Sequence, residues 1–82
     1  MKLFWIEFKK GSTGMLFRLG CGISAVDKED AWKVVRESKT LSTMMENVSS
    51  IKEIKASEIE KNHVLPNSGN YASRGIWFPN GI

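Results

Sequence analysis

Residues 2–26 decide the fold, and they read KLFWIEFKKGSTGMLFRLGCGISAV. Apolar and polar residues alternate in two runs, residues 2–9 and 15–26, which is the pattern of half-buried strands. In the second run every other residue from Met15 to Ala25 is apolar. Residues 11–14, GSTG, make a suitable four-residue hairpin loop between the runs. The sequence therefore predicts an antiparallel β-hairpin.

The apolar faces of the two strands fix the expected register, because a slip by one residue would turn one face to the wrong side. A four-residue loop pairs Lys10 with Met15. Three apolar pairs and two pairs on the opposite face then follow along the strands. These are Phe8–Phe17, Ile6–Leu19 and Phe4–Cys21 on the apolar face, and Glu7–Arg18 and Trp5–Gly20 on the other.

A helix is expected after the hairpin, with Asp27 as its N-cap and its end near Ser38. Asp30 places a carboxylate in the first turn, where the positive end of the helix favours it. An apolar stripe at helical spacing faces the sheet and consists of Ala31, Val34 and Val35.

The chain after Lys39 is harder to assign. Its apolar residues have helical spacing, but the residues between them are weak helix formers, so a short helical turn and a loop both fit. Core filling explains the methionines better than a promiscuous binding surface does, because so short a chain has little other core. The apolar residues in question are Leu41, Met44, Met45 and Val48.

Three short elements are expected further along. Residues 51–55 predict a third strand, and Ser57 begins a capping-box pattern for a very short helix that ends near Asn62. Residues 75–78 predict a short edge strand that Pro79 stops.

The last twenty residues predict an ordered, irregular segment. They carry one charged residue and two large aromatic residues near their end, whereas a disordered tail is rich in charge and poor in such residues. We interpret the first part as a structural turn in which the His63 ring bonds a backbone carbonyl. Catalysis by this lone imidazole is less favoured, because no nucleophile or metal ligand accompanies it at a telling spacing. The turn residues are His63, Pro66, Asn67 and Gly69.

These elements predict an α+β fold in one domain that covers residues 1–82. An antiparallel sheet of three or four strands carries one main helix on one face, in the order β-β-α-β. The ordered irregular C-terminal segment follows.

The composition excludes several classes of function. The net charge is +3, but the 12 Lys and Arg are scattered among 9 Asp and Glu, without the basic run that nucleic-acid binding favours. Cys21 is the single cysteine, so neither an internal disulfide nor a cysteine-based zinc cluster can form. We expect its thiol to be packed and inert, and the protein to be cytoplasmic, without a signal peptide, metal or cofactor.

The face of the hairpin opposite the Phe4 side holds Trp5 beside Gly20 and Gly22. A flat apolar patch of this kind marks an interaction site when it is exposed. Coverage by Trp77 and Phe78 of the closing segment is the favoured alternative, since tryptophan is rarely left bare.

Arg74 has no acidic residue near it in the sequence, so it either fixes a turn or reaches a partner. Arginine, tryptophan and tyrosine are the usual anchors of protein interfaces. The candidate partner-binding residues are Trp5, Arg18, Tyr71, Arg74 and Trp77.

Four motifs resemble those of a group of small, mostly uncharacterised bacterial proteins. They are LGCG at 19–22, DKEDA at 27–31, HVLPNSG at 63–69 and RGIWFP at 74–79. Proteins of this group are often suspected to be immunity proteins, each encoded beside a toxin whose active site it plugs. The resemblance implies the same role here, with a cognate toxin as the partner. The basic charge departs from what a nuclease inhibitor needs, which favours a toxin that acts on protein, a nucleotide cofactor or the cell wall.

The sequence thus leaves two functional hypotheses ahead of an enzyme. The first is a non-enzymatic module that binds another protein, an immunity protein in particular. The alternative is a small nucleic-acid-binding domain that uses Trp5, Arg18 and neighbouring lysines on a sheet face.

Overall fold

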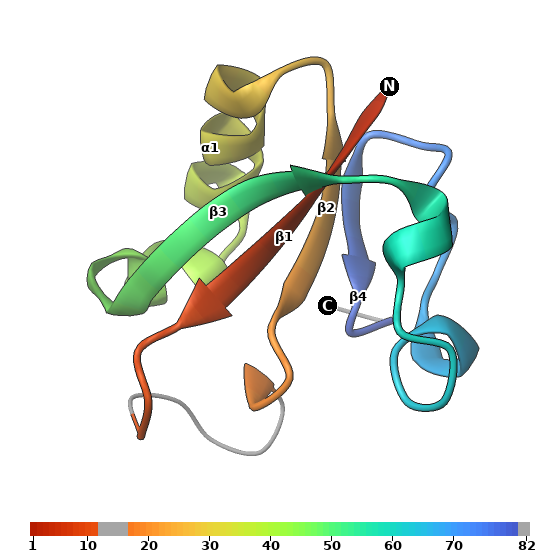
Figure 1. Ribbon diagram of the computed structural model, residues 1–82. Helices are drawn as coiled ribbons and strands as arrows, with labels where there is room; N and C mark the ends of the chain where they lie inside the picture. The colour runs from red at the N-terminus through yellow and green to blue at the C-terminus, as the bar shows by residue number, and fades with distance from the viewer. Residues whose placement is uncertain (12–16, 81–82) are drawn as a thin grey trace.

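The computed structural model describes residues 1–11 and 17–80, and in this part of the chain four strands form one antiparallel sheet (Figure 1). The order of the strands is β3-β1-β2-β4. Their bounds are β1 Lys2–Phe8, β2 Cys21–Ala25, β3 Val48–Ile54 and β4 Gly75–Phe78. This is the α+β architecture that the sequence predicts, with the predicted edge strand at residues 75–78 as its fourth strand.

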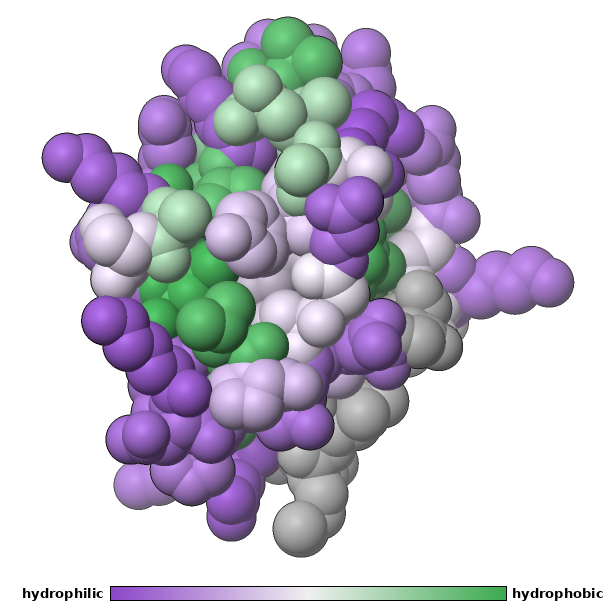
Figure 2. All heavy atoms as spheres, turned by 90° about the vertical axis from the view of Figure 1, so that its right-hand side faces the viewer, coloured by the Kyte–Doolittle hydropathy of each residue, from purple (hydrophilic) through white to green (hydrophobic). Residues whose placement is uncertain are grey.

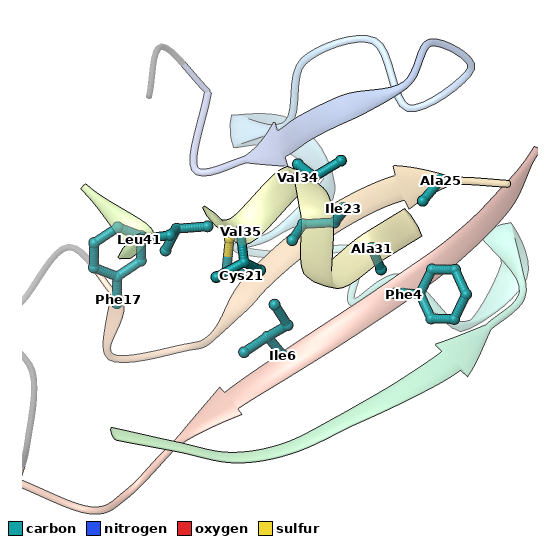
Figure 3. Packing of buried hydrophobic residues seen from close by; sticks show 10 residues of the cluster. All are labelled: Phe4, Ile6, Phe17, Cys21, Ile23, Ala25, Ala31, Val34, Val35 and Leu41. Carbon is teal, nitrogen blue, oxygen red and sulfur yellow. The ribbon is translucent and has the colours of Figure 1, made fainter. Parts of the chain in front are cut away.

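One face of the sheet is covered by α1 (Lys28–Glu37), which lies where the apolar stripe predicts it (Figure 1). Asp27 is its N-cap and accepts a hydrogen bond from the backbone N–H of Asp30 at 2.8 Å. The carboxylate of Asp30 in turn accepts from the backbone N–H of Val26 at 3.0 Å, so two backbone donors at the start of the helix have side-chain acceptors. Figure 3 shows the side chains that meet between α1, β1 and β2. They are Phe4, Ile6, Phe17, Cys21, Ile23, Ala25, Ala31, Val34, Val35 and Leu41.

The hairpin exists, but the expected register is wrong by two residues. Phe4 lies opposite Ile23, Trp5 opposite Gly22, and Ile6 opposite Cys21. An even slip keeps every side chain on its expected face, so the apolar pattern alone cannot detect it. The strand begins only at Cys21 because Gly20, at φ +122°, leaves the extended conformation. The expected loop and the Lys10–Met15 pair fall largely on residues 12–16, outside the described residues.

The other expected pairs of the hairpin also change. The rings of Phe8 and Phe17 still meet, with centroids 5.5 Å apart, although Phe17 lies outside β2. The pairs of β1 with β2 end at Ile6–Cys21 and do not include the expected Glu7–Arg18 pair, while Glu7 lies opposite Ser50 on the β3 side.

The remaining elements are short. η2 (Leu41–Asn47) is a 3-10 helix whose Leu41 is buried and whose methionines pack against the core, in line with core filling. β3 is longer than expected, and an irregularity in its pairing at Glu7 and Phe8 places Val48 and Ile51 on the same face, against the first core. Ile54 lies on the opposite face and packs in a second cluster, which explains its spacing of three from Ile51. The expected cap at Ser57 is wrong, because η3 (Ala56–Glu58) begins after Lys55, whose N–H donates to the Glu58 side chain.

Candidate functional site

A second hydrophobic layer covers the face of the sheet opposite α1. Leu3, Trp5 and Ile54 supply its sheet side. Trp77 and Phe78 join them from β4, and Ile59 and Val64 cover the layer from the segment between β3 and β4. The favoured prediction, that the closing segment folds over Trp5, is therefore correct.

Trp77 and Phe78 both reach this layer because β4 is bulged. Gly22 pairs with Phe78 while Ile23 pairs with Ile76, so Trp77 is the extra residue. The Trp5 ring lies 6.0 Å from the Trp77 ring and 5.7 Å from the Phe78 ring, measured between centroids. Gly22 permits this stacking, because a Cβ there would stand 2.4 Å from Cζ2 of Trp77.

A cleft of about 380 Å³ opens beside Trp5, between the surface of β1 and β3 and the segment that follows η3. Its apolar part combines the half-buried Trp5 with Leu19, Ile54, Ile59 and Val64. Its polar part consists of Glu7, Lys52, Glu58, Glu60 and His63. Figure 2 shows the molecule from the side of the segment that follows β3, where hydrophobic surface lies among hydrophilic side chains.

One wall of the cleft is fixed by the carboxylate of Glu60. Oε1 accepts hydrogen bonds from the backbone N–H groups of His63 and Val64, and Oε2 accepts from that of Asn62 at 3.1 Å. These hydrogen bonds, led by those from His63 and Val64, lower the pKa of Glu60 from 4.5 to about 2. The carboxylate is therefore charged at neutral pH and held in one position.

The His63 ring contacts Glu60 and not a backbone carbonyl of the turn in which we expected it to be bonded. Its Nδ1 lies 3.5 Å from Oε2 of Glu60, and its side chain is 73% exposed. The prediction that the ring bonds a backbone carbonyl is wrong. The side chain of Asn67 fills that role instead, since its Nδ2 donates to the His63 carbonyl at 2.7 Å.

The other expected turn residues hold the segment to β4. Pro66 lies within η4 (Leu65–Asn67). The backbone N–H of Gly69 donates to the carbonyl of Trp77 at 2.6 Å, and that of Asn80 donates to the carbonyl of Asn67 at 3.1 Å. β4 is an edge strand of the sheet. These hydrogen bonds therefore cover part of its outer side with the closing segment.

Arg74 joins the closing segment to α1. Its Nε and Nη2 donate to the carboxylate of Asp30 at 2.9–3.2 Å, and Nη1 donates to Glu37 at 3.3 Å. The guanidinium holds the pKa of Asp30 at about 2, below its usual 3.8, and the pair raises the pKa of Arg74. We expected Arg74 to fix a turn or to contact a partner. The structure shows a third arrangement, in which Arg74 forms ion pairs with two carboxylates of α1.

The structure separates the five candidate partner-binding residues. Trp5 lines the cleft, and Arg18 is exposed one residue before Leu19 of its rim. The Tyr71 and Trp77 rings meet at a steep angle, with centroids 6.2 Å apart, and Tyr71 lines a different groove from the one beside Trp5. Trp77 is only 1% exposed, so its expected contact with a partner is wrong, and it serves packing.

Sequence reasoning missed four charged residues of the cleft, Glu7, Lys52, Glu58 and Glu60. Lys52 lies opposite Trp5 in the β1–β3 ladder, which the sequence does not reveal without the pairing of these strands. The capping-box pattern in the sequence indicated a folded turn around Glu58. For Glu60, the available signal was its position three residues before His63.

Cys21 is buried in the first core, and desolvation raises the pKa of its thiol to about 12, so it is protonated at neutral pH. No group of three or more His, Cys, Asp or Glu among residues 1–11 and 17–80 is placed to hold a metal ion. In the same residues no helix has the length and apolar character needed to cross a membrane.

Comparisons with protein families, with curated proteins and with solved structures gave no match for this chain. The geometry of the cleft is therefore the basis for assigning a function.

Proposed function

We propose that this chain is a non-enzymatic module that binds another protein through the cleft beside Trp5. The observation that carries the proposal is the half-buried indole at the wall of an open cleft, with apolar and charged side chains around it. Buried cores of protein interfaces are enriched in aromatic residues and ringed by polar ones. A half-buried indole gains contact area when a partner covers it, whereas the buried Trp77 does not.

The resemblance to suspected immunity proteins supports a cognate bacterial toxin as the partner. An inhibitor of this kind needs a surface held rigid before binding, because a preordered surface loses little conformational entropy on association. The hydrogen bonds to Glu60 and the Arg74–Asp30 ion pair fix the segment around the cleft in this way. The lone buried thiol supports a reducing compartment, and we propose the cytoplasm.

Nucleic-acid binding receives less support from the same geometry. The indole and Arg18 would have to approach phosphates beside the carboxylates of Glu7, Glu58 and Glu60. Like charges at an interface oppose association, and no retention in a gel-shift assay at low salt would eliminate this alternative.

The proposal is tested with the purified chain and the product of the adjacent gene, by isothermal titration calorimetry. A one-to-one complex is expected, and Trp5→Ala should weaken it by at least about 2 kcal/mol, as hot-spot residues do. Trp32→Ala is the matched control, because Trp32 is also half-buried but lies on α1, on the other face of the sheet.

Circular dichroism must show that both variants are folded before their affinities are compared. Equal affinities of folded Trp5→Ala and Trp32→Ala would contradict the use of this cleft. Absence of any complex with the adjacent gene product would contradict the toxin as partner.

A further inference from the structure

The cleft beside Trp5 has a charge opposite to that of the whole chain. The chain carries a net charge of +3. Three glutamates and one lysine line the cleft, Glu7, Glu58, Glu60 and Lys52, which leaves it negative at neutral pH. A local field of this sign attracts a cation and repels phosphate or carboxylate groups.

Two of these carboxylates are already fixed by backbone hydrogen bonds. Glu60 accepts from three backbone N–H groups, and Oε1 of Glu58 accepts from the N–H of Lys55 at 2.8 Å. The structure gives Glu60 and Glu58 no lysine or arginine side chain as a partner among residues 1–11 and 17–80. Their negative charge is therefore presented in a fixed place; the side chain that contacts it is the exposed His63 ring, whose Nδ1 lies 3.5 Å from Oε2 of Glu60.

The size and apolar part of the cleft limit what can enter it. A volume of about 380 Å³ lies near the lower end of the usual range for small-ligand sites, about 300–1,000 Å³. A helix or a strand does not fit such a space, whereas one long side chain does. Trp5, Leu19 and Ile54 offer apolar surface to the stem of that side chain.

We propose that the cleft binds an arginine side chain of the partner protein, with its stem against Trp5 and its guanidinium facing Glu7 and Glu58. This inference rests on the proposed function and specifies the group that the partner presents. Arginine fits better than lysine because its planar, weakly hydrated guanidinium stacks on an indole and donates to two carboxylates at once.

The test is selection from a displayed library of random twelve-residue peptides on the immobilised full chain. Peptides that bind the wild type in preference to Trp5→Ala are sequenced. We expect arginine to be enriched at least about threefold over its frequency in the unselected library and over lysine, because guanidinium and ammonium differ in stacking and hydrogen-bond geometry.

The strongest selected peptide is then synthesised with arginine and with citrulline, which keeps the shape and removes the charge. Citrulline should weaken binding to the wild type at least about tenfold, as expected when a desolvated cation–π contact and its carboxylate partners are lost. In Glu7→Gln/Glu58→Gln the difference between the two peptides should largely disappear. Glu46→Gln, an exposed glutamate outside the cleft, should keep it.

The possible outcomes separate the inference from the proposed function. Selected peptides without arginine enrichment, or equal binding of the citrulline peptide, overturn the arginine assignment and leave a protein-binding cleft. Selection of no peptide that prefers the wild type over folded Trp5→Ala overturns the use of the cleft itself. Glutamine at position 58 keeps an oxygen for the Lys55 N–H, so the double variant is expected to fold.

Discussion

Replacing Gly22 by alanine tests how the closing segment is held against the sheet. The new Cβ would stand 2.4–2.5 Å from three atoms of the six-membered ring of Trp77. Such contacts cannot persist, and Trp77 is 1% exposed, so its ring has little free space into which it can move. Overpacking of this kind costs about 1–3 kcal/mol.

That cost is large for a chain of 82 residues. A domain of this size is stable by about 4–12 kcal/mol, at roughly 0.05–0.15 kcal/mol per residue. Each kcal/mol lowers the melting temperature of a small domain by about 4–8 °C. Gly22→Ala should therefore lower Tm by about 4–24 °C.

The assay is urea unfolding followed by far-UV circular dichroism, for Gly22→Ala, Trp77→Phe and the double variant. Phenylalanine lacks the ring atoms that the new methyl group meets, so Gly22→Ala should cost at least about 1 kcal/mol less in that background. Trp77→Phe also removes Nε1, a buried donor without a hydrogen-bond partner in the described part of the chain, which offsets part of the lost contact area. An equal cost of Gly22→Ala in both backgrounds would refute the steric explanation.

Three further predictions concern titratable groups. The carboxyls of Asp30 and Glu60 have pKa values of about 2 in the fold, against ordinary values of 3.8 and 4.5. Their contribution to the stability of the fold is therefore complete above about pH 4.5 and is lost as the pH falls towards 2. Thermal unfolding between pH 6 and pH 2 measures this loss of stability. Arg74→Gln should flatten the Asp30 part of that dependence and lower Tm more at pH 6 than at pH 2, and equal losses at both would count against the ion pair. The pKa of the Cys21 thiol is raised to about 12 by burial, so iodoacetamide at pH 8 should leave native protein unlabelled and label it fully in urea; rapid native labelling would contradict the packing.

The sequence predicts most of the fold because its elements carry local signals. Alternation finds β1, helical spacing with the Asp27 cap finds α1, and aromatic residues late in the chain indicate an ordered segment. The hairpin register fails for a physical reason. A shift of two residues preserves both faces, and the loop length that would distinguish the two registers depends on the conformation of Gly20.

The candidate site was less predictable, because long-range contacts build it. Arg74 pairs with Asp30 across 44 residues of sequence, and no local pattern announces this ion pair. Lys52 enters the cleft because β3 pairs with β1 in one particular register. Trp5 was identified because an aromatic residue opposite glycines is a local signal, whereas Trp77 was misassigned because burial depends on what covers it.

The cleft and the second hydrophobic layer depend on the same segment of chain. Ile59 and Val64 belong both to the layer under Trp77 and to the wall of the cleft, and Glu60 and His63 lie between them. Only a few side chains hold this layer, while the first core gathers residues from β1, β2, α1 and η2. Local opening of residues 56–66 would therefore remove one wall of the cleft and leave the buried residues of the first core in place. The cleft exists only while the closing segment is packed, so Gly22, which admits the Trp77 ring, supports the shape of the cleft without lining it.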